Sequence, residues 1–405
     1  MAGPLDGIVV LDLSRILAGP WATQCLADLG ANVIKIERLS EGDDTRAWGP
    51  PFFGDNDDQL SAYFMSANRG KRSLALDITT PEGQHVVRRL AGKSDILVEN
   101  FKVDGLKKYG LDYASLKALN PGLIYCSITG FGQSGPYKNR PGYDLMIQGI
   151  GGMMSVTGEP DHMPGGGPLR AGVAVTDLFT GMYGSVGILA ALYHREKTGE
   201  GQYIDMGLLD TQVAVLANQG MSYLVSGKSP ERQGNSHPSI VPYQSFATKD
   251  GHMILAVGND GQFDRFCRAA GLPELVSDER FSTNPARVKN RAALIDILAI
   301  AVRQKTTQEW TAILEAANVP GGPINSIEDV YADVQVQARG IQKTIEVPGG
   351  ETVPVVANPI HFSETKTVYN RPPPRVGEHT DEVLQEMLDL NADEIAALKG
   401  AKAAG

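Results

Sequence analysis

Cysteine is scarce in this chain, and the few cysteines lie far apart. Cys25, Cys126 and Cys267 all occur in apolar or helical contexts, which predicts buried, reduced thiols and no disulfide framework. No group of Cys and His has the spacing of a zinc site, so we expect no bound metal. The chain also begins without an apolar signal segment. Together these absences favour a cytoplasmic protein.

Long apolar runs and an excess of positive charge are missing as well. No stretch approaches the roughly 18 uninterrupted apolar residues of a membrane-spanning helix, so we expect none. The formal net charge of −10 argues against nucleic acid or an anionic membrane as the main partner. With 42% hydrophobic and 21% charged residues, the composition is typical of a globular α/β protein of more than one domain.

A third absence concerns the turn after the first predicted strand. That turn reads S-R-I-L-A-G-P and lacks the G-x-G-x-x-G glycines that let a backbone approach a dinucleotide pyrophosphate. We therefore exclude NAD and FAD. Strand and helix patterns nevertheless alternate, which predicts a parallel, Rossmann-like sheet. The expected strands are 7–13, 32–37, 73–78, 95–99 and 123–128, with helices at 20–29 and from Pro81.

The second half of the chain has a different organisation. Residues 132–170 are rich in Gly and Pro and predict loops, and the triple glycine at 165–167 lacks the Lys-Ser/Thr of a phosphate loop. Asp250-Gly251 predicts the turn of a hairpin. The remaining expected elements are a strand at 202–205, helices at 208–225, 261–271, 290–303 and 307–317, an edge hairpin at 343–356 and a last helix from Thr380.

Asp177 is the residue on which a functional interpretation depends. It lies in R-A-G-V-A-V-T-D-L-F-T-G-M at 170–182, where small residues lead into a long apolar segment. The pattern places Asp177 at the start of a helix, where free N–H groups and the helix dipole keep a carboxylate ionised. Such an acid can be a cap or a nucleophile, and caps are far more common. The local pattern leaves both roles open.

Several motifs in order resemble the class III CoA-transferases, the family of formyl-CoA transferase and carnitine CoA-transferase. The resemblance runs from about residue 5 to residue 397. Within the family it is most similar to the succinyl-CoA:glutarate type, because of H-P-S-I-V-P-Y-Q-S-F at 237–246. The motifs are V-L-D-L-S-R-I-L-A-G-P (10–20), N-V-I-K-I-E-R (32–38), G-D-D-T-R-A-W-G-P-P (42–51), N-R-G-K-R-S-L-A-L-D (68–77), V-E-N-F (98–101), G-Y-D (142–144), R-A-G-V-A-V-T-D (170–177) and G-E-H-T-D-E-V-L (377–384).

The resemblance implies a particular architecture. Members of the family are ring-shaped chains with a Rossmann-like large domain and a smaller α+β domain, and two rings interlock into a homodimer. Applied to this chain, the large domain comprises 1–200 and the returning segment 371–405. The small domain is 236–325, and 201–235 and 326–370 are linkers.

The resemblance also implies a reaction. Asp177 matches the family nucleophile, which exchanges one thioester for another through an aspartyl-CoA thioester. Such an exchange needs no ATP, metal or resident cofactor, and CoA or acyl-CoA is a substrate. The donor expected from the resemblance is succinyl-CoA, and the expected acceptor is a small dicarboxylic acid. The family's CoA contacts fall on Arg38, Leu76, Thr79, Asn100, Phe101, Lys108 and Tyr143.

Some positions depart from the formyl-CoA transferase pattern. Lys108 stands where that enzyme has Arg, and Thr79 replaces a Lys. Nearby cations that could compensate are Lys71, Arg72, Lys102 and Arg140. Leu17 stands where that enzyme has a Gln beside the nucleophile, which argues against formyl or oxalyl exchange. The second carboxylate of a dicarboxylic acid needs a cation or a hydrogen-bond donor to bind it. The candidates for this role are Arg46, Arg170 and His237, and Leu17 is a further candidate for the substrate pocket.

Two other functions compete with CoA transfer. The α-methylacyl-CoA racemases share this fold but use a His base in a G-H-D segment, whereas this chain has G-Y-D. Tyr143 is a poor base at neutral pH because an unperturbed phenol has a pKa near 10. A non-catalytic acyl-CoA-binding protein is the other alternative, although it would not need the nucleophile motif.

Overall fold

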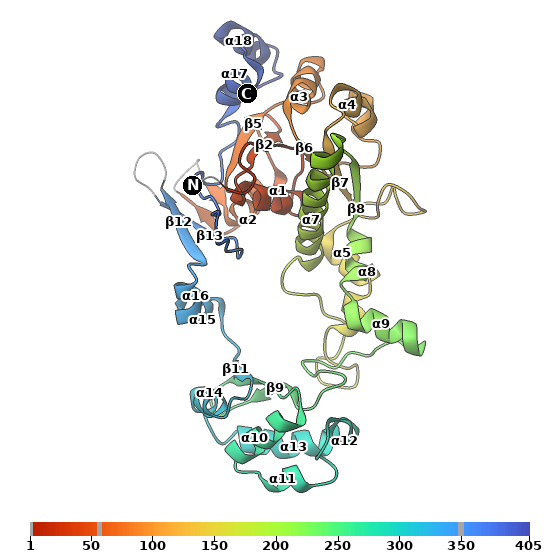
Figure 1. Ribbon diagram of the computed structural model, residues 1–405, viewed down its shortest axis with the longest axis vertical. Coiled ribbons are helices and arrows are strands. Elements are labelled where there is room, and N and C mark those ends of the chain that lie inside the picture. The colour runs from red at the N-terminus through yellow and green to blue at the C-terminus, as the bar shows by residue number, and fades with distance from the viewer. Residues whose placement is uncertain (1–2, 55–58, 347–351) are drawn as a thin grey trace. The chain divides into compact units, whose positions relative to one another are not determined.

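The computed structural model describes residues 3–54, 59–346 and 352–405. The chain divides into two compact units (Figure 1). Unit 1 comprises 1–153, 171–225 and 336–405, and unit 2 comprises 154–170 and 226–335. These boundaries differ from the expected ones, because residues 201–225 are not a linker but form part of unit 1.

Unit 1 is built on a six-stranded parallel sheet, which makes the chain an α/β protein. The strand order is β5-β2-β1-β6-β7-β8. This is the doubly wound order, in which the direction of winding reverses between β1 and β6. The bounds are β1 Val9–Asp12, β2 Asn32–Glu37, β5 Lys71–Ala75, β6 Ile96–Glu99, β7 Ile124–Thr129 and β8 Tyr203–Gly207. All the strands predicted for this sheet are present, most with ends shifted by one or two residues.

Both faces of this sheet are covered, which explains why its strands read as continuous apolar runs. Leu11 and Leu97 face helices α3 (Pro81–Lys93), α4 (Tyr113–Leu119) and α17 (Thr380–Leu388). Val10 and Val98 face the opposite layer, formed by α1 (Ala18–Asp28) and α7 (Val175–Thr198). The alternation of buried side chains between two helical layers gives unit 1 its two cores.

Helix α7 meets the length and composition criteria of a membrane-spanning helix, the one helix in the described part of the chain to do so. The expectation of none considered only uninterrupted apolar runs, and the polar and glycine residues of α7 interrupt such a run. Its Ile188 and Leu192 pack on the sheet with Val98 and Ile124. Helix α7 is therefore a core helix of unit 1.

The remaining elements of unit 1 connect or flank the sheet. The expected helix at 208–225 is divided at Val215–Leu216, because Ala217 has a left-handed φ of 47°. The elements are η1 Asp44–Ala47, β3 Phe52–Phe53, β4 Leu60–Ser61, α2 Ala62–Ser66, η3 Lys107–Tyr109, α5 Asp144–Ile150, α8 Leu208–Ala214, α9 Ala217–Ser226, β12 Gln342–Glu346, β13 Thr352–Val356 and α18 Ala392–Gly400. The short helices α6 Met153–Val156 and α16 Val334–Ala338 lie across unit boundaries.

Unit 2 is a small antiparallel sheet covered by helices. The predicted hairpin is present as β9 (Tyr243–Ala247) and β10 (His252–Ala256), and β11 (Gly321–Pro323) pairs with β10 on the other side. The sequence P-G-G-P at 320–323 thus contributes an edge strand. The helices are α10 Asp260–Ala269, α11 Glu274–Ser277, α12 Asn284–Lys289, α13 Arg291–Val302, α14 Thr307–Ala316 and α15 Ile327–Ala332.

Candidate active site

Asp177 lies in the first turn of α7, as its third residue. The helix begins after Ala174, which provides no side-chain cap, and ends at Gly199, whose left-handed φ of 76° stops it. The sequence prediction of a helix start is confirmed. The Thr176 hydroxyl does not cap the helix, because it donates to Gln212 Oε1 at 2.6 Å.

The cap of α7 comes instead from Asp144, in the first turn of α5. Its Oδ1 accepts from the backbone N–H of Thr176 at 2.8 Å and of Asp177 at 3.3 Å. Gln148 Nε2 donates to the other oxygen of Asp144 at 2.6 Å. Asp144 is therefore a functional candidate that the sequence interpretation missed, although it was the last residue of the quoted G-Y-D motif.

This arrangement changes the charge state of Asp177. Burial, and secondarily the neighbouring Asp144 carboxylate, raise the pKa of Asp177 to about 7. The helix start therefore does not keep the pKa of Asp177 low, because burial disfavours the charged form and Asp144 takes the N–H groups and adds a like charge. A carboxyl group with a pKa near neutrality, at a helix end, is typical of an active site.

Tyr63, on α2, lies near the same carboxyl groups. Burial raises the pKa of its phenol, and the negative charges of Asp177, Asp144 and Asp43 raise it further. Its ring packs edge-on against Trp48 at 5.0 Å between centroids. The hydroxyl therefore stays protonated and can donate a hydrogen bond near the nucleophile. No sequence signal singled out Tyr63.

The predicted CoA contacts gather at the carboxyl edge of the parallel sheet. The edge next to the point where strand order reverses is where ligands bind in such sheets. Lys108 lies in η3, and Tyr143 precedes α5 with 66% of its surface exposed. Arg38 follows β2, Leu76 follows β5, and Asn100 and Phe101 follow β6, whereas Thr79 lies in the turn between β5 and α3.

These residues differ in what they can offer a ligand. Arg38 is exposed but pairs with Asp44 at 2.9 Å. Leu76 is only 2% exposed and its side chain packs in the core, which leaves it little surface for a ligand. Asn100 has its amide engaged with the backbone of Arg15.

Two of the four cations proposed to compensate are unavailable. Lys71 is fully buried and its Nζ donates to Asp12 Oδ2 at 3.0 Å. Arg72 is buried and pairs with Glu386 at 2.7 Å. Lys102 and Arg140 remain exposed, and the Arg140 guanidinium lies over the ring of Tyr137. The sequence shows that these lysines lie near predicted loops, but it does not show which lysine is buried in the core and which is exposed.

The four residues predicted to lie near the substrate's distal carboxylate also differ in how far the fold leaves them free to bind it. Leu17 is buried immediately before α1. Arg46 is committed to the structure, since it makes two hydrogen bonds to Glu37 at 2.9 and 2.7 Å and lies 3.7 Å above the Phe64 ring. It is therefore not free to bind a substrate carboxylate.

Arg170 and His237 belong to unit 2. Arg170 is exposed. His237 Nδ1 accepts from the backbone N–H of Ser239 at 3.1 Å, and its ring contacts Tyr243. The His237 ring thus has a structural role in its turn.

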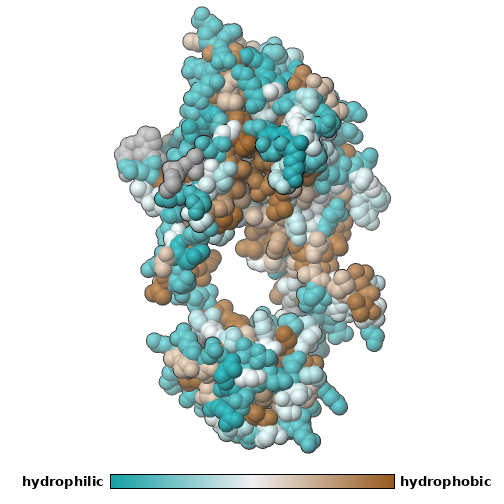
Figure 2. All heavy atoms as spheres, in the orientation of Figure 1, coloured by the Kyte–Doolittle hydropathy of each residue, from teal (hydrophilic) through white to brown (hydrophobic). Residues whose placement is uncertain are grey.

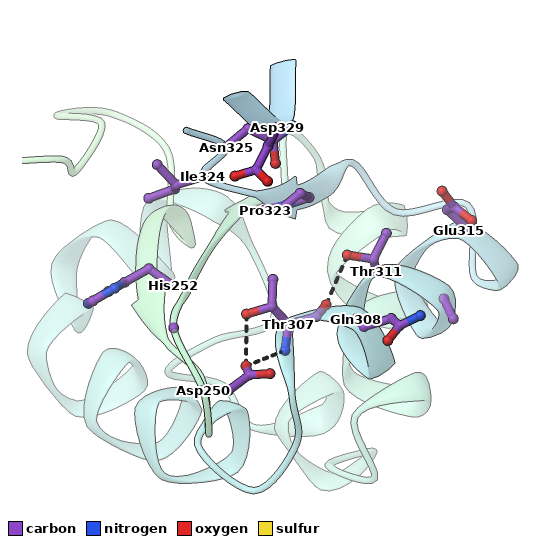
Figure 3. Close-up of a pocket in the computed structure, with 12 residues that line it drawn as sticks. Asp250, His252, Thr307, Gln308, Thr311, Glu315, Pro323, Ile324, Asn325 and Asp329 are labelled. Carbon is purple, nitrogen blue, oxygen red and sulfur yellow. Dashed lines mark hydrogen bonds between the residues drawn. The ribbon is translucent and has the colours of Figure 1, made fainter. Parts of the chain in front are cut away.

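Each unit also has a pocket. One of about 280 Å³ in unit 1 is lined by Lys102, Tyr113, Tyr203 and Glu99, whose pKa burial raises to about 7. One of about 620 Å³ in unit 2 contains none of the predicted residues. Figure 3 shows Asp250 accepting from Thr307 and Thr311 donating to the Thr307 carbonyl in this pocket. The carboxyl edge of unit 1 is therefore the better candidate.

Comparison with known proteins identifies the family. The model of CoA-transferase family III matches residues 5–380. Succinate–glutarate CoA-transferase of Agrobacterium fabrum is 54% identical over 95% of this chain and 96% of its own length. The human succinyl-CoA:glutarate CoA-transferase is 43% identical over 98% of this chain and 89% of its own length.

A solved structure agrees with these matches. A CAIB/BAIF family protein from Brucella suis is 52% identical, with a TM-score of 0.86, over 96% of this chain and all (100%) of its own. In this family a CoA thioester is a substrate and no cofactor is permanently bound. The chain therefore belongs to CoA-transferase family III and is a CoA-transferase.

Proposed function

We propose that this enzyme transfers CoA from succinyl-CoA to a small dicarboxylic acid such as glutarate, with Asp177 as the nucleophile. The acid and donor are supported by the names of the relatives in Agrobacterium fabrum and human. The observation that carries the role of Asp177 is its position in the first turn of α7, beside Asp144, with a pKa raised to about 7. If Asp177 were only a helix cap, its own carboxylate would accept the free backbone N–H groups at the start of α7. In this structure the Asp144 carboxylate accepts them instead.

The reaction needs only carboxylates and a thioester. An Asp177 oxygen attacks the succinyl-CoA carbonyl carbon, which gives a mixed anhydride and expels CoA thiolate. The thiolate then attacks the Asp177 carbonyl carbon and releases succinate, leaving an aspartyl-CoA thioester. The acceptor carboxylate attacks this thioester and forms a second anhydride and CoA thiolate. Attack of that thiolate on the acceptor carbonyl gives the new acyl-CoA and restores Asp177.

The raised pKa of Asp177 favours part of this sequence. An ionised carboxylate is needed for attack, and the Asp177 carboxylate is the leaving group when the second anhydride is resolved. A group with a pKa near 7 is a stronger nucleophile than an ordinary carboxylate while still being substantially ionised at neutral pH. We infer that Tyr63, whose phenol pKa is raised by burial and by the Asp177 charge, donates a hydrogen bond to a carboxylate or oxyanion at this site.

The test is a transfer assay with a panel of acids. Succinyl-CoA is incubated with glutarate, itaconate, mesaconate and other small acids, and the acyl-CoA products are separated by chromatography. Glutarate or a close analogue is expected to be the best acceptor. Hydroxylamine should trap a hydroxamate at Asp177 when the donor is present. Exchange of deuterium at Cα of a 2-methylacyl-CoA without CoA transfer would instead identify a racemase.

A homodimer is the second part of the proposal, with the two chains interlocked. The chain passes between the two units four times, a connectivity that is compatible with the ring-shaped chain we propose. Hydrophobic residues gather over α9 in Figure 2, where Leu224 and Val225 are 74% and 81% exposed. The exposed apolar residues of α7 are Phe179, Met182, Tyr183, Val186, Leu189 and Tyr193. This much exposed apolar surface is typical of a subunit interface.

The oligomeric state can be measured directly. Light scattering and native mass spectrometry should give a dimer that persists at nanomolar concentration, because interlocked chains separate only on unfolding. Val186→Glu should lower the Tm of the dimer, whereas Leu119→Glu, at an exposed apolar residue of α4, should leave it nearly unchanged. A monomeric wild type would contradict this part of the proposal.

We also propose a cytoplasmic location. The support is that all three cysteines are free and buried, which suits a reducing compartment. Cell fractionation of the producing organism is the test, and recovery in an oxidising compartment would contradict it.

A further inference from the structure

The loop between β1 and α1 has an unusual backbone at the switch point of the sheet. Ile16 has a φ of 72°, a left-handed conformation that a β-branched residue adopts only when its surroundings impose it. In dinucleotide-binding proteins, glycines occupy this turn. Here residues 14–17 read S-R-I-L, so something other than glycine must hold the turn.

Side chains from β1, from β2, from the start of η1 and from the residue after β6 hold it. The N–H of Ser14 donates to Asp12 Oδ1 at 2.9 Å, and Lys35 Nζ donates to the Ser14 carbonyl at 2.8 Å. The N–H of Ile16 donates to both carboxylate oxygens of Asp43 at 3.3 Å. Asp43 stays ionised, because Lys35 and Thr45 lower its pKa to about 2 although burial alone would raise it.

Asn100 provides the remaining two bonds. The N–H of Arg15 donates to Asn100 Oδ1 at 2.9 Å, and Asn100 Nδ2 donates to the Arg15 carbonyl at 2.7 Å. Asn100 directly follows β6, so this pair of bonds bridges the gap between β1 and β6 where the strand order reverses. The amide faces the Arg15 backbone with both its donor and its acceptor, which is a pairing with protein and not with a ligand.

The loop lies next to the nucleophile. In α7, a Cβ added to Gly181 would meet the carbonyl oxygen of Ala18 at 2.6 Å, so the first turns of α7 and α1 are in close contact. Asp177 is one turn before Gly181 and on the same face of the helix. Asp43 and Asp177 both act on the phenol of Tyr63. The clamped loop and the nucleophile thus face the same space.

We infer that Asn100 is a positioning residue, which fixes the 14–17 loop beside Asp177 and so sets the geometry of the acyl group under attack. This inference rests on the proposed role of Asp177. It replaces the expectation that the Asn100 side chain contacts CoA. A small displacement of a loop at a reacting centre costs up to about 100-fold in rate without weakening remote binding.

The two roles predict opposite kinetics for Asn100→Ala. A positioning role predicts that kcat falls by about 10- to 100-fold, while the dissociation constant of CoA, measured calorimetrically, changes by less than about threefold. A CoA contact predicts the reverse, a dissociation constant raised tenfold or more with kcat retained, and that result would overturn the inference. Asn100→Asp keeps the acceptor for the Arg15 N–H and loses the donor, so its kcat should be intermediate.

Asn120 offers a matched control. Its Nδ2 donates to the carbonyls of Ala91 and Ser94 at 3.0 and 2.8 Å, and its Oδ1 accepts from Gly122. It thus also clamps a loop, but it precedes β7 and lies at the opposite, amino edge of the sheet. Asn120→Ala should lower the Tm about as much as Asn100→Ala while leaving kcat within about twofold.

Equal losses of kcat in the two variants would mean general destabilisation and would also overturn the inference. Should Asn100→Ala fail to fold, Asn100→Asp decides the question by the same split between kcat and CoA binding. Wild-type enzyme is assayed in parallel. A wild type that transfers no CoA contradicts the proposed function, whereas an active wild type with an unaltered Asn100 variant contradicts only this inference.

Discussion

Helix α14 in unit 2 and helix α7 in unit 1 begin in opposite ways. Thr306 caps α14 and Glu309 returns the bond, a capping box complete within four consecutive residues. Helix α7 has no local cap and receives its hydrogen bonds from Asp144, 33 residues before Asp177. A helix that caps itself is locally stable wherever it lies. A helix capped from a distance leaves its own acid uncompensated, and this frees Asp177 for chemistry.

The largest expected effect is the loss of CoA transfer in Asp177→Ala, which tests whether Asp177 is more than an ordinary acid in the first turn of a helix. Asp177→Ala should lower CoA transfer by at least about 10⁴-fold, because it removes the nucleophile. The variant should stay folded, since burial that raises the pKa of Asp177 makes the ionised group costly to the folded state at pH 8. Transfer is measured by chromatography and folding by circular dichroism.

Asp210 is the matched control, as the third residue of α8. Asp210→Ala should retain nearly full activity. Comparable losses in the two variants would mean that any acid in a first turn matters, and the assignment of Asp177 would be wrong.

The next effect concerns the long-range contacts of the loop before α1. Lys35 and Asp43 form a pair at 2.9 Å with both side chains fully buried. Lys35→Met should lower the free energy of unfolding by about 3–5 kcal/mol, because it leaves a buried carboxylate without its partner. Lys93→Met breaks an exposed pair with Asp389 and should cost only about 0–1 kcal/mol. Denaturant titration checks both, and equal costs would contradict the distinction.

Asp144 should set the pH dependence of activity. Asp177 must lose a proton to attack, so kcat/KM for succinyl-CoA should rise with pH through a midpoint near pH 7 and level off above it. Asp144→Asn removes a like charge and should move this midpoint to lower pH. Burial is the larger cause of the raised pKa, so the midpoint should remain above that of an ordinary aspartate. An unchanged profile would mean that another group controls it.

The smallest expected effect concerns the local cap of α14. Thr306→Ala removes a local cap and should cost about 1 kcal/mol of stability without changing kcat or the pH profile. Thermal unfolding and the transfer assay measure the two quantities. A changed pH profile in this variant would show that capping acts on catalysis by some general route, and the contrast with Asp144 would fail.

Most of the fold could be predicted from periodicity. The parallel strands of unit 1 are buried on both faces and read as short apolar runs, and the hairpin of unit 2 follows from its Asp250-Gly251 turn. Strand β11 was missed because P-G-G-P carries no strand pattern and pairs only through its backbone with β10. The divided helix at 208–226 was missed because nothing local announces the positive φ of Ala217.

The site was predictable only in part, for a related reason. Asp177 and the residues at the carboxyl edge could be placed, because helix starts and strand ends are local features. Three pairings could not be predicted: Arg46 with Glu37, Lys71 with Asp12 and Asn100 with Arg15. The partners of the last pair, for example, are 85 residues apart. A cation in a sequence looks equally available whether a partner is folded against it or not.

The sequence by itself determined the family, the parallel sheet and the carboxylate at the start of α7. These follow from motifs and periodicities that lie within short segments. Only the tertiary structure decided that Asp144 caps that helix, that Asp177 has a pKa near 7 and that side chains replace glycines in the first turn. The physical reason is that charge, burial and hydrogen bonding depend on which distant groups the folded chain brings within a few ångströms.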